Sequence, residues 1–262
     1  MNRNTHARPI PLDDIRYFEC EGVVDDGSYD HYTGRLFQVP SLAVARANRL
    51  ATLCYRRKVS ITKSCLYLCF TPALPDGVVR LTDFRREVWQ RYVMYGLPLS
   101  FNQGDEESRV ERVWMATLQS LREIVPSEQI ESVDEAASLV EAGGEDLRFP
   151  LASAKTKTHL AELAYTMPTW PGMARLLLTV TDRSSLVHGT CVLFESKLSD
   201  ECGFVGGKVK IIDGNVIARP AASSQGRYYA KLNNVSSFVV SIESLLQGKA
   251  SVIRNPHEAD EA

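Results

Sequence analysis

The last quarter of the chain, residues 208–248, constrains the fold most because several local patterns agree there. Two runs rich in β-branched residues, 208–212 and 216–218, flank an Asp-Gly-Asn tripeptide at 213–215. Glycine and asparagine adopt the positive φ of a tight turn at low cost, so these runs predict an antiparallel hairpin. Pro220 then ends the second strand, because proline has no N–H to donate to a neighbouring strand.

The residues after this hairpin predict one more strand and a closing helix. A run with two tyrosines at 228–232 favours a strand, and apolar residues at helical spacing favour a helix over 235–247. Asn234 is placed to cap the start of that helix, and Gly248 to cap its end. The predicted fold class is therefore α+β, a mostly antiparallel sheet flanked by amphipathic helices, with a C-terminal hairpin, strand and helix.

This C-terminal stretch also carries a resemblance. The sequence IIDGNVIA, a polar gap and then LNNVSSFVVSIESLL resemble the C-terminal part of SUKH-type (SMI1/KNR4-like) immunity proteins of bacterial toxin systems. Residues 95–98, Tyr-Gly-Leu-Pro, are loosely similar to a Gly-Leu-Pro element of some members, whereas the Asn-Gly-Gly element of many members is missing. The resemblance covers about 40 of the 262 residues. It implies a terminal helix that contains Phe238 and a protein that binds and neutralises a cognate toxin.

Composition indicates a soluble protein that can fold without covalent cross-links. With 262 residues, 44% hydrophobic and 24% charged, the chain can bury a sizeable core in one or two domains. No window approaches the roughly 20 apolar residues of a membrane helix, and residues 1–12 lack the apolar region of a signal peptide. We therefore expect a cytoplasmic protein that has no membrane partner.

Cysteine usage indicates a reducing compartment. The six cysteines are scattered through apolar surroundings, which predicts free, mostly buried thiols and no disulfides. They are Cys20, Cys54, Cys65, Cys69, Cys191 and Cys202.

The first half of the chain predicts both strands and helices. Strands are expected over residues 13–24, 64–71 and 77–81, and the almost continuously apolar run 64–71 is typical of a buried central strand. Helices are expected over 41–55 and 83–95, where apolar residues recur at helical spacing.

The best-formed helix of the first half is expected over residues 105–125. Asp105, Glu106 and Glu107 lie in its first turn, where the helix dipole favours acids, and a wide apolar stripe follows before Pro126 stops it.

A boundary is expected in the middle of the chain, at the Gly/Pro-rich residues 142–153. We predict an N-terminal α+β half over residues 1–145 and a C-terminal α+β half over 154–250, unless both belong to one continuous domain. Around and beyond this boundary, helices are expected at 133–141 and 158–165, a turn at 167–172, and strands at 175–181 and 189–197.

No decisive catalytic or cofactor signature is present. The closest cysteine pair, Cys65 and Cys69, has no histidine nearby, so no zinc site is expected. His188 and Cys191, in the sequence HGTC, would point to opposite faces of a strand. The glycines of 203–208 lead into a strand, whereas a phosphate loop leads into a helix, so we expect a hairpin loop there. No catalytic residue, metal or cofactor is predicted.

Charge is segregated along the chain although the net charge is only −2. Residues 31–75 hold seven bases and no acid, and residues 105–146 hold twelve acids against three bases. Each run can be a solvated helix face, but segregated charge also creates local potentials that attract partners. The candidate partner-binding acids are Asp105, Glu106, Glu107, Glu111, Glu128, Glu131, Asp134 and Glu135. The candidate basic patch is Arg46, Arg49, Arg56, Arg57 and Lys58.

These observations leave three hypotheses. The first is an immunity protein that neutralises a basic toxin through the acidic residues. The second is an enzyme whose site assembles from distant residues such as Asp182, His188, Glu195 and Asp213. The third is a nucleic-acid adaptor that uses the basic patch, and it is the weakest because few aromatic residues accompany those bases.

Overall fold

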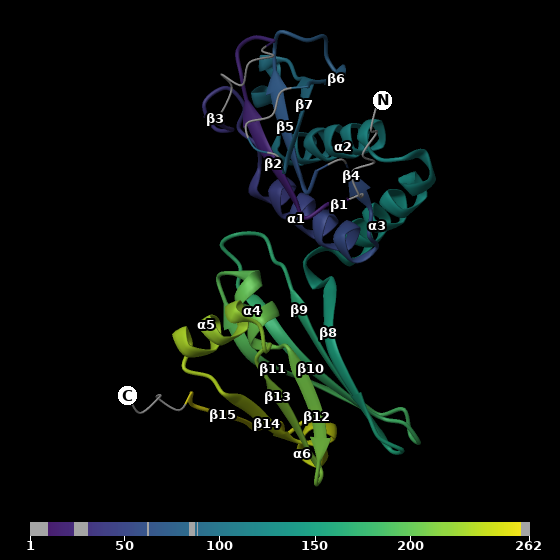
Figure 1. Ribbon diagram of the computed structural model, residues 1–262, viewed down its shortest axis with the longest axis vertical. Coiled ribbons are helices and arrows are strands. Elements are labelled where there is room, and N and C mark those ends of the chain that lie inside the picture. The colour runs from purple at the N-terminus through teal and green to yellow at the C-terminus, as the bar shows by residue number, and fades with distance from the viewer. Residues whose placement is uncertain (1–9, 24–30, 62, 84–86, 88, 258–262) are drawn as a thin grey trace, which may run out of the picture. The chain divides into compact units, whose positions relative to one another are not determined.

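The computed structural model describes residues 10–23, 31–61, 63–83, 87 and 89–257. The chain divides into two compact units, an N-terminal unit of residues 1–144 and a C-terminal unit of residues 145–262. Figure 1 shows helices and sheets in both units. The fold class is α+β, with six α-helices and four mostly antiparallel sheets among the described residues. The chain passes from the first unit to the second after Gly144, within the expected 142–153 boundary, although strand β8 (Arg148–Lys155) already occupies part of that range.

The N-terminal unit is built on a five-stranded sheet in the order β3-β2-β5-β7-β6. Its centre is parallel, since β5 pairs in parallel with both β2 and β7. The strands are β2 (Asp14–Glu19), β3 (His31–Tyr32), β5 (Cys65–Thr71), β6 (Val79–Leu81) and β7 (Gln90–Gly96), and β1 (Ile10–Pro11) pairs with β4 (Ser60–Ile61) outside this sheet. All seven residues of β5 are buried, which confirms the predicted central strand.

Three helices accompany this sheet, namely α1 (Ser41–Arg56), α2 (Glu106–Ile124) and α3 (Ile130–Gly143). Short 3₁₀ helices lie at Leu99–Gln103, Ser127–Gln129 and Gly144–Asp146. Helix α1 connects the parallel strands β2 and β5, and the Tyr17 hydroxyl of β2 lies 2.8 Å from the Thr117 hydroxyl of α2. Helix α3 packs on α1 and α2 through Val133, Ala136, Ala137 and Val140. The N-terminal unit is thus a sheet whose helices lie mainly on one face (Figure 1).

The C-terminal unit contains two four-stranded antiparallel sheets. One has the order β11-β10-β9-β8, from β8 (Arg148–Lys155), β9 (His159–Thr166), β10 (Ala174–Asp182) and β11 (His188–Ser196). The other has the order β12-β13-β14-β15, from β12 (Lys208–Ile212), β13 (Asn215–Arg219), β14 (Ser237–Ser241) and β15 (Val252–Asn255). The helices are α4 (Ser199–Val205), α5 (Ser224–Leu232) and α6 (Ile242–Leu246). Phe149, Leu163, Leu176, Leu178 and Phe238 are buried in this unit.

Predictions that rested on local signals are confirmed. The β12–β13 hairpin turns at Asp213 and Gly214, whose φ angles are 48° and 74°, and β13 ends before Pro220. Helix α2 has Asp105 as its N-cap, which accepts a 2.7 Å hydrogen bond from the Ser108 N–H. Strands β10 and β11, and helix α1, also lie where expected, although Pro40 precedes α1 without a side-chain cap.

Two predicted helices are strands. Residues 90–95 of the expected 83–95 helix belong to β7, while Phe84 and Val88 lie outside the described residues. Tyr92 to Tyr95 are all buried, and a strand covered on both faces needs apolar residues at every position. The expected 158–165 helix is β9, in which alternate residues Ala161, Leu163 and Tyr165 are buried. Tertiary packing here overrides the helix preference of Ala, Leu and Glu.

After the hairpin, the expected strand is a helix, and much of the expected helix is a strand. Residues 228–232 belong to helix α5, which begins where the Ser223 side chain accepts a hydrogen bond from the Gly226 N–H at 3.0 Å. Asn234 caps no helix and has a φ of 50°, and the β-branched run after it forms β14. Only residues 242–246 are helical, as α6, and Gly248 ends that helix with a φ of 71°. The expected 203–208 loop is also wrong in part, since α4 extends to Val205.

Candidate functional site

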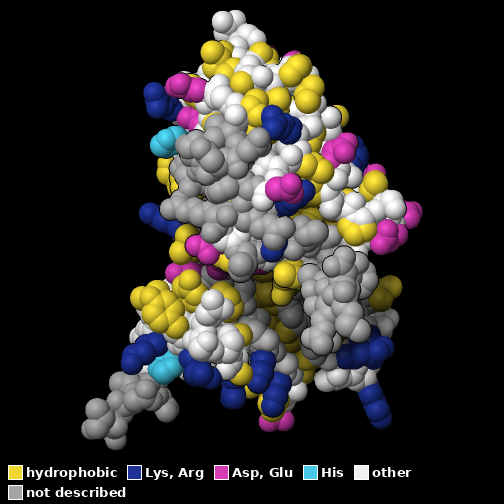
Figure 2. Space-filling model, turned by 45° about the horizontal axis from the view of Figure 1, so that its top comes forward, with side chains coloured by type: hydrophobic (Ala, Val, Ile, Leu, Met, Phe, Trp, Pro, Cys, Tyr) yellow, Lys and Arg dark blue, Asp and Glu magenta, His cyan; other side chains and the backbone are white. Residues whose placement is uncertain are grey.

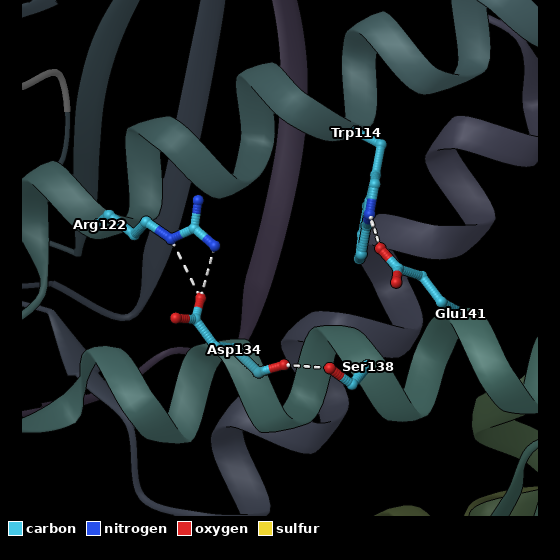
Figure 3. Close-up of polar contacts among 5 residues, drawn as sticks. All are labelled: Trp114, Arg122, Asp134, Ser138 and Glu141. Carbon is cyan, nitrogen blue, oxygen red and sulfur yellow. Dashed lines mark hydrogen bonds and ion pairs between the residues drawn. The ribbon is translucent and has the colours of Figure 1, made fainter.

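Helices α2 and α3 carry most of the candidate partner-binding acids, and polar contacts join α2 to α3 near both ends of α3 (Figure 3). At one end the Arg122 guanidinium donates to Asp134 at 2.7 and 3.0 Å. At the other end the Trp114 indole N–H donates to the Glu141 carboxylate at 2.6 Å. Within α3, the Ser138 hydroxyl donates to the Asp134 carbonyl at 2.9 Å. These contacts, added to the apolar packing of α3, fix the two helices relative to each other.

Half of the candidate acids are used inside the fold. Asp105 is the N-cap of α2, and Glu111 lies 3.6 Å from Arg46 of α1. Asp134 pairs with Arg122, and Glu135 pairs with Arg57 of α1. The acidic run of the sequence therefore meets the basic run across the helices of the N-terminal unit. Part of the charge segregation serves internal pairing.

The other four candidate acids, Glu106, Glu107, Glu128 and Glu131, are exposed and have no ion pair within the described part of the chain. We call them the free acids. Glu106 and Glu107 lie in the first turn of α2, and Glu128 and Glu131 lie just before and at the start of α3. Because α2 has 19 residues at about 1.5 Å per residue, the two pairs lie roughly 28 Å apart along it. The free acids therefore form two separate clusters.

The candidate basic patch does not form one exposed surface. Arg46 and Arg57 pair with acids of α2 and α3, and Arg49 is only 1% exposed. The expectation that Arg49 projects outward is wrong, because α1 is covered by α2 and α3 as well as by the sheet. Arg56 and Lys58 are exposed at the C-terminal end of α1.

Exposed basic residues gather instead on the C-terminal unit. Residues 147–257 hold thirteen bases and seven acids, and Figure 2 shows Lys and Arg side chains gathered over this unit on the face it presents. On strands β12 and β13, Lys208 lies directly opposite Arg219, and Lys210 follows two residues later on the same face. None of these three has an ion pair among the described residues, and like charges placed opposite each other repel. The alternating Lys-Val-Lys pattern signals this face in the sequence.

A buried carboxylate was missed in the sequence. Glu19, at the end of β2, is 1% exposed and accepts hydrogen bonds from four consecutive backbone N–H groups. The distances are 3.1 Å from Gly34, 2.9 Å from Arg35, 3.0 Å from Leu36 and 3.0 Å from Phe37. An acid inside an apolar strand, as in IRYFEC, is the sequence signal for such a role. Glu19 orders the segment before α1, and with all four donors within the chain it serves the fold.

The residues considered for an enzyme do not converge. Asp182 accepts hydrogen bonds from the N–H groups of Ser184 and Ser185 in its own turn, and Glu195 pairs with Arg175 at 3.0 Å. His188 and Cys191 lie three residues apart on β11 in regular register, so their side chains point to opposite faces. Among the described residues, no three His, Cys, Asp or Glu side chains are grouped as metal ligands would be.

Asp213 is the one of these residues that lines a described pocket. The pocket measures about 500 Å³ and contains His159 of β9, Asn215 of β13 and Glu243 of α6. With Ser241 of β14, its polar groups come from four different elements, which makes it a candidate place for a small polar ligand.

Comparisons of the chain with protein-family models, with curated protein sequences and with solved structures gave no match. Across the described residues, no helix has both the length and the apolar character required to span a bilayer. The SUKH resemblance implies a terminal helix that contains Phe238, but Phe238 lies on strand β14.

Proposed function

We propose that the protein is a binding protein of the immunity type, which neutralises a toxin with a basic surface by docking it on the acidic side of α2 and α3. The observation that carries this proposal is the set of free acids, which stay exposed and unpaired while their neighbours are paired. Exposed carboxylates that form no ion pair within the fold are available to pair with the bases of a partner.

The electrostatic balance of the helices supports a cationic partner. Residues 105–146 have an excess of nine negative charges, and the five bases of residues 41–58 leave four of these uncompensated. Complementary charge raises association rates and suppresses wrong partners, even where it adds little final affinity.

The same two helices also offer apolar contact area. Met115 on α2 and Leu139 on α3 are 49% and 43% exposed. Protein interfaces combine an apolar centre with a polar rim, so these side chains are candidates for the centre and the free acids for the rim. The polar contacts near both ends of α3 would hold α3 rigid against the C-terminal half of α2, which lowers the entropy lost on binding.

The direct test is capture and rescue. The purified chain is immobilised and offered the product of the adjacent open reading frame, and the two proteins are co-expressed in cells that the product alone arrests. We expect a stable complex and restored growth. No complex and no rescue would contradict the proposal.

A pair of matched double variants tests the surface. Glu128→Lys with Glu131→Lys reverses one cluster of free acids, and Glu162→Lys with Glu243→Lys reverses two exposed acids of the C-terminal unit as a control. We expect roughly tenfold slower association for the first variant, with the difference shrinking as salt rises. Equal rates for both variants at low salt would place the interface elsewhere.

A further inference from the structure

The face of the N-terminal sheet that points away from α2 carries a pair of thiols in contact. Tyr17 contacts Thr117 of α2, so Phe18 and Cys20 lie on the opposite side of the sheet. Cys69 lies opposite Phe18 in the parallel register and therefore shares the face of Cys20. The Cys69 thiol donates a hydrogen bond to the Cys20 sulfur across a distance of 3.3 Å.

We propose that Cys20 and Cys69 form a redox-active dithiol that a peroxide converts to an intramolecular disulfide. A disulfide has an S–S distance of about 2.05 Å, so the sulfur atoms must approach by about 1.2 Å. Cys20 directly follows β2 and Cys69 lies on the neighbouring strand β5, so adjacent segments hold the two thiols.

The surroundings select Cys20 as the attacking thiol. The hydrogen bond from Cys69 lowers the pKa of the Cys20 thiol, although burial and the nearby Glu19 carboxylate oppose this. By contrast, burial raises the pKa of Cys65, and it raises the pKa values of Cys54 and Cys202 to about 12. The thiolate is the nucleophile, so the lowered pKa favours Cys20 as the attacking thiol. Cys20 is also 7% exposed, whereas Cys69 is fully buried.

The chemistry balances with peroxide as the only oxidant. The Cys20 thiolate attacks one peroxide oxygen, the O–O bond breaks, and a sulfenic acid and hydroxide form. The Cys69 sulfur then attacks the Cys20 sulfur, the S–O bond breaks, and water leaves with the proton of Cys69. Two thiols lose two electrons and two protons in total, and one hydrogen peroxide becomes two waters.

The test counts thiols in the intact full chain. The reduced protein is treated with hydrogen peroxide, unfolded, alkylated and weighed, and its peptides are mapped without reduction. We expect the wild-type chain to lose two alkylatable thiols and to yield one reducible cross-linked peptide that joins residue 20 to residue 69. Retention of all thiols, or a cross-link between other cysteines, would overturn the proposal.

Two variants test which cysteines form the cross-link and which of them reacts with the peroxide. Cys65→Ser removes a third thiol from the same sheet face, four residues from Cys69, and should leave the cross-link unchanged. Cys69→Ser removes the resolving thiol, so a dimedone adduct should accumulate on Cys20. Loss of the cross-link in Cys65→Ser, or a dimedone adduct on another cysteine, would count against the assignment. The wild-type measurement stands without either variant if one of them fails to fold.

Discussion

The two units use their polar side chains over very different ranges of sequence. In the N-terminal unit, hydrogen bonds and ion pairs join distant segments, as Arg57 with Glu135 and Tyr17 with Thr117 do. In the C-terminal unit, many polar contacts stay within one turn or between neighbouring strands, as Arg175 with Glu195 shows. In the N-terminal unit, opposite charges form ion pairs that join its helices. In the C-terminal unit, most basic side chains are exposed to solvent. A run of like charges in the sequence therefore predicts a charged binding surface only for those residues that form no ion pair within the fold.

The largest effect is expected from the apolar core of the C-terminal unit. Phe238→Ala removes a fully buried ring from β14 and should lower the free energy of unfolding by about 3–5 kcal/mol. Urea denaturation measures the loss, and hydrogen exchange should show earlier opening of β12 to β15. Ile253→Ala, an exposed change on β15, is the control. If both variants lost equal stability, the core of this unit would not be organised around Phe238.

The N-terminal unit should respond most to the loss of a polar group. Glu19→Ala leaves four backbone N–H groups around a buried site without their acceptor, and we expect a loss of about 3 kcal/mol. Glu19→Gln keeps one carbonyl acceptor and should lose less. Urea denaturation of both variants tests whether Glu19→Ala loses more stability than Glu19→Gln. Equal stability of Glu19→Ala and the wild-type chain would show that the carboxylate is dispensable.

Ion pairs give a direct comparison between the units. Double-mutant cycles on Arg122 with Asp134 and on Arg175 with Glu195 should each yield a coupling of at most about 1 kcal/mol, because all four side chains are substantially exposed. We expect the larger coupling for Arg122 with Asp134, whose side chains are less exposed. Both couplings should fall as salt rises, and a larger coupling in the C-terminal pair would reverse the comparison.

The smallest effect is expected at a turn of the C-terminal unit. Hydrogen bonds from Ser184, and from the Ser185 N–H, lower the pKa of Asp182 from 3.8 to about 2. A lowered pKa in the folded state means that the carboxylate stabilises the fold above pH 3.8 and loses this effect as pH falls through 2. The stability difference between wild type and Asp182→Asn should therefore be constant near neutral pH and shrink in acid. A difference that grows in acid would contradict this sign.

Elements whose structure is determined by a few neighbouring residues could be predicted from the sequence. The Asp213-Gly214 turn needs only two residues with positive φ, and α2 carries its own cap and apolar stripe. The sequences of β7 and β9 could not be distinguished from helical sequences, because their apolar residues fit both the helical and the strand periodicity. Only burial in the sheet decides between the two. Helix α5 was signalled by Ser223, but its tyrosines favoured a strand when considered alone.

The candidate site was predictable only at the level of composition. The acidic and basic runs were visible, yet their mutual pairing depends on how α1, α2 and α3 pack, which no local pattern contains. Glu19 and the thiols of Cys20 and Cys69 depend in the same way on contacts between segments 15 to 49 residues apart.

The loop held by Glu19 has a further consequence. Four successive N–H groups that converge on one carboxylate form an anion receptor, and here the anion belongs to the same chain, at a high effective concentration. Once the side chain is shortened to Ala, the receptor is vacant and a small free carboxylate such as formate can enter it. Formate should then raise the melting temperature of Glu19→Ala and leave that of the wild-type chain unchanged, which makes the segment before α1 a position where folding can be placed under the control of an added ion.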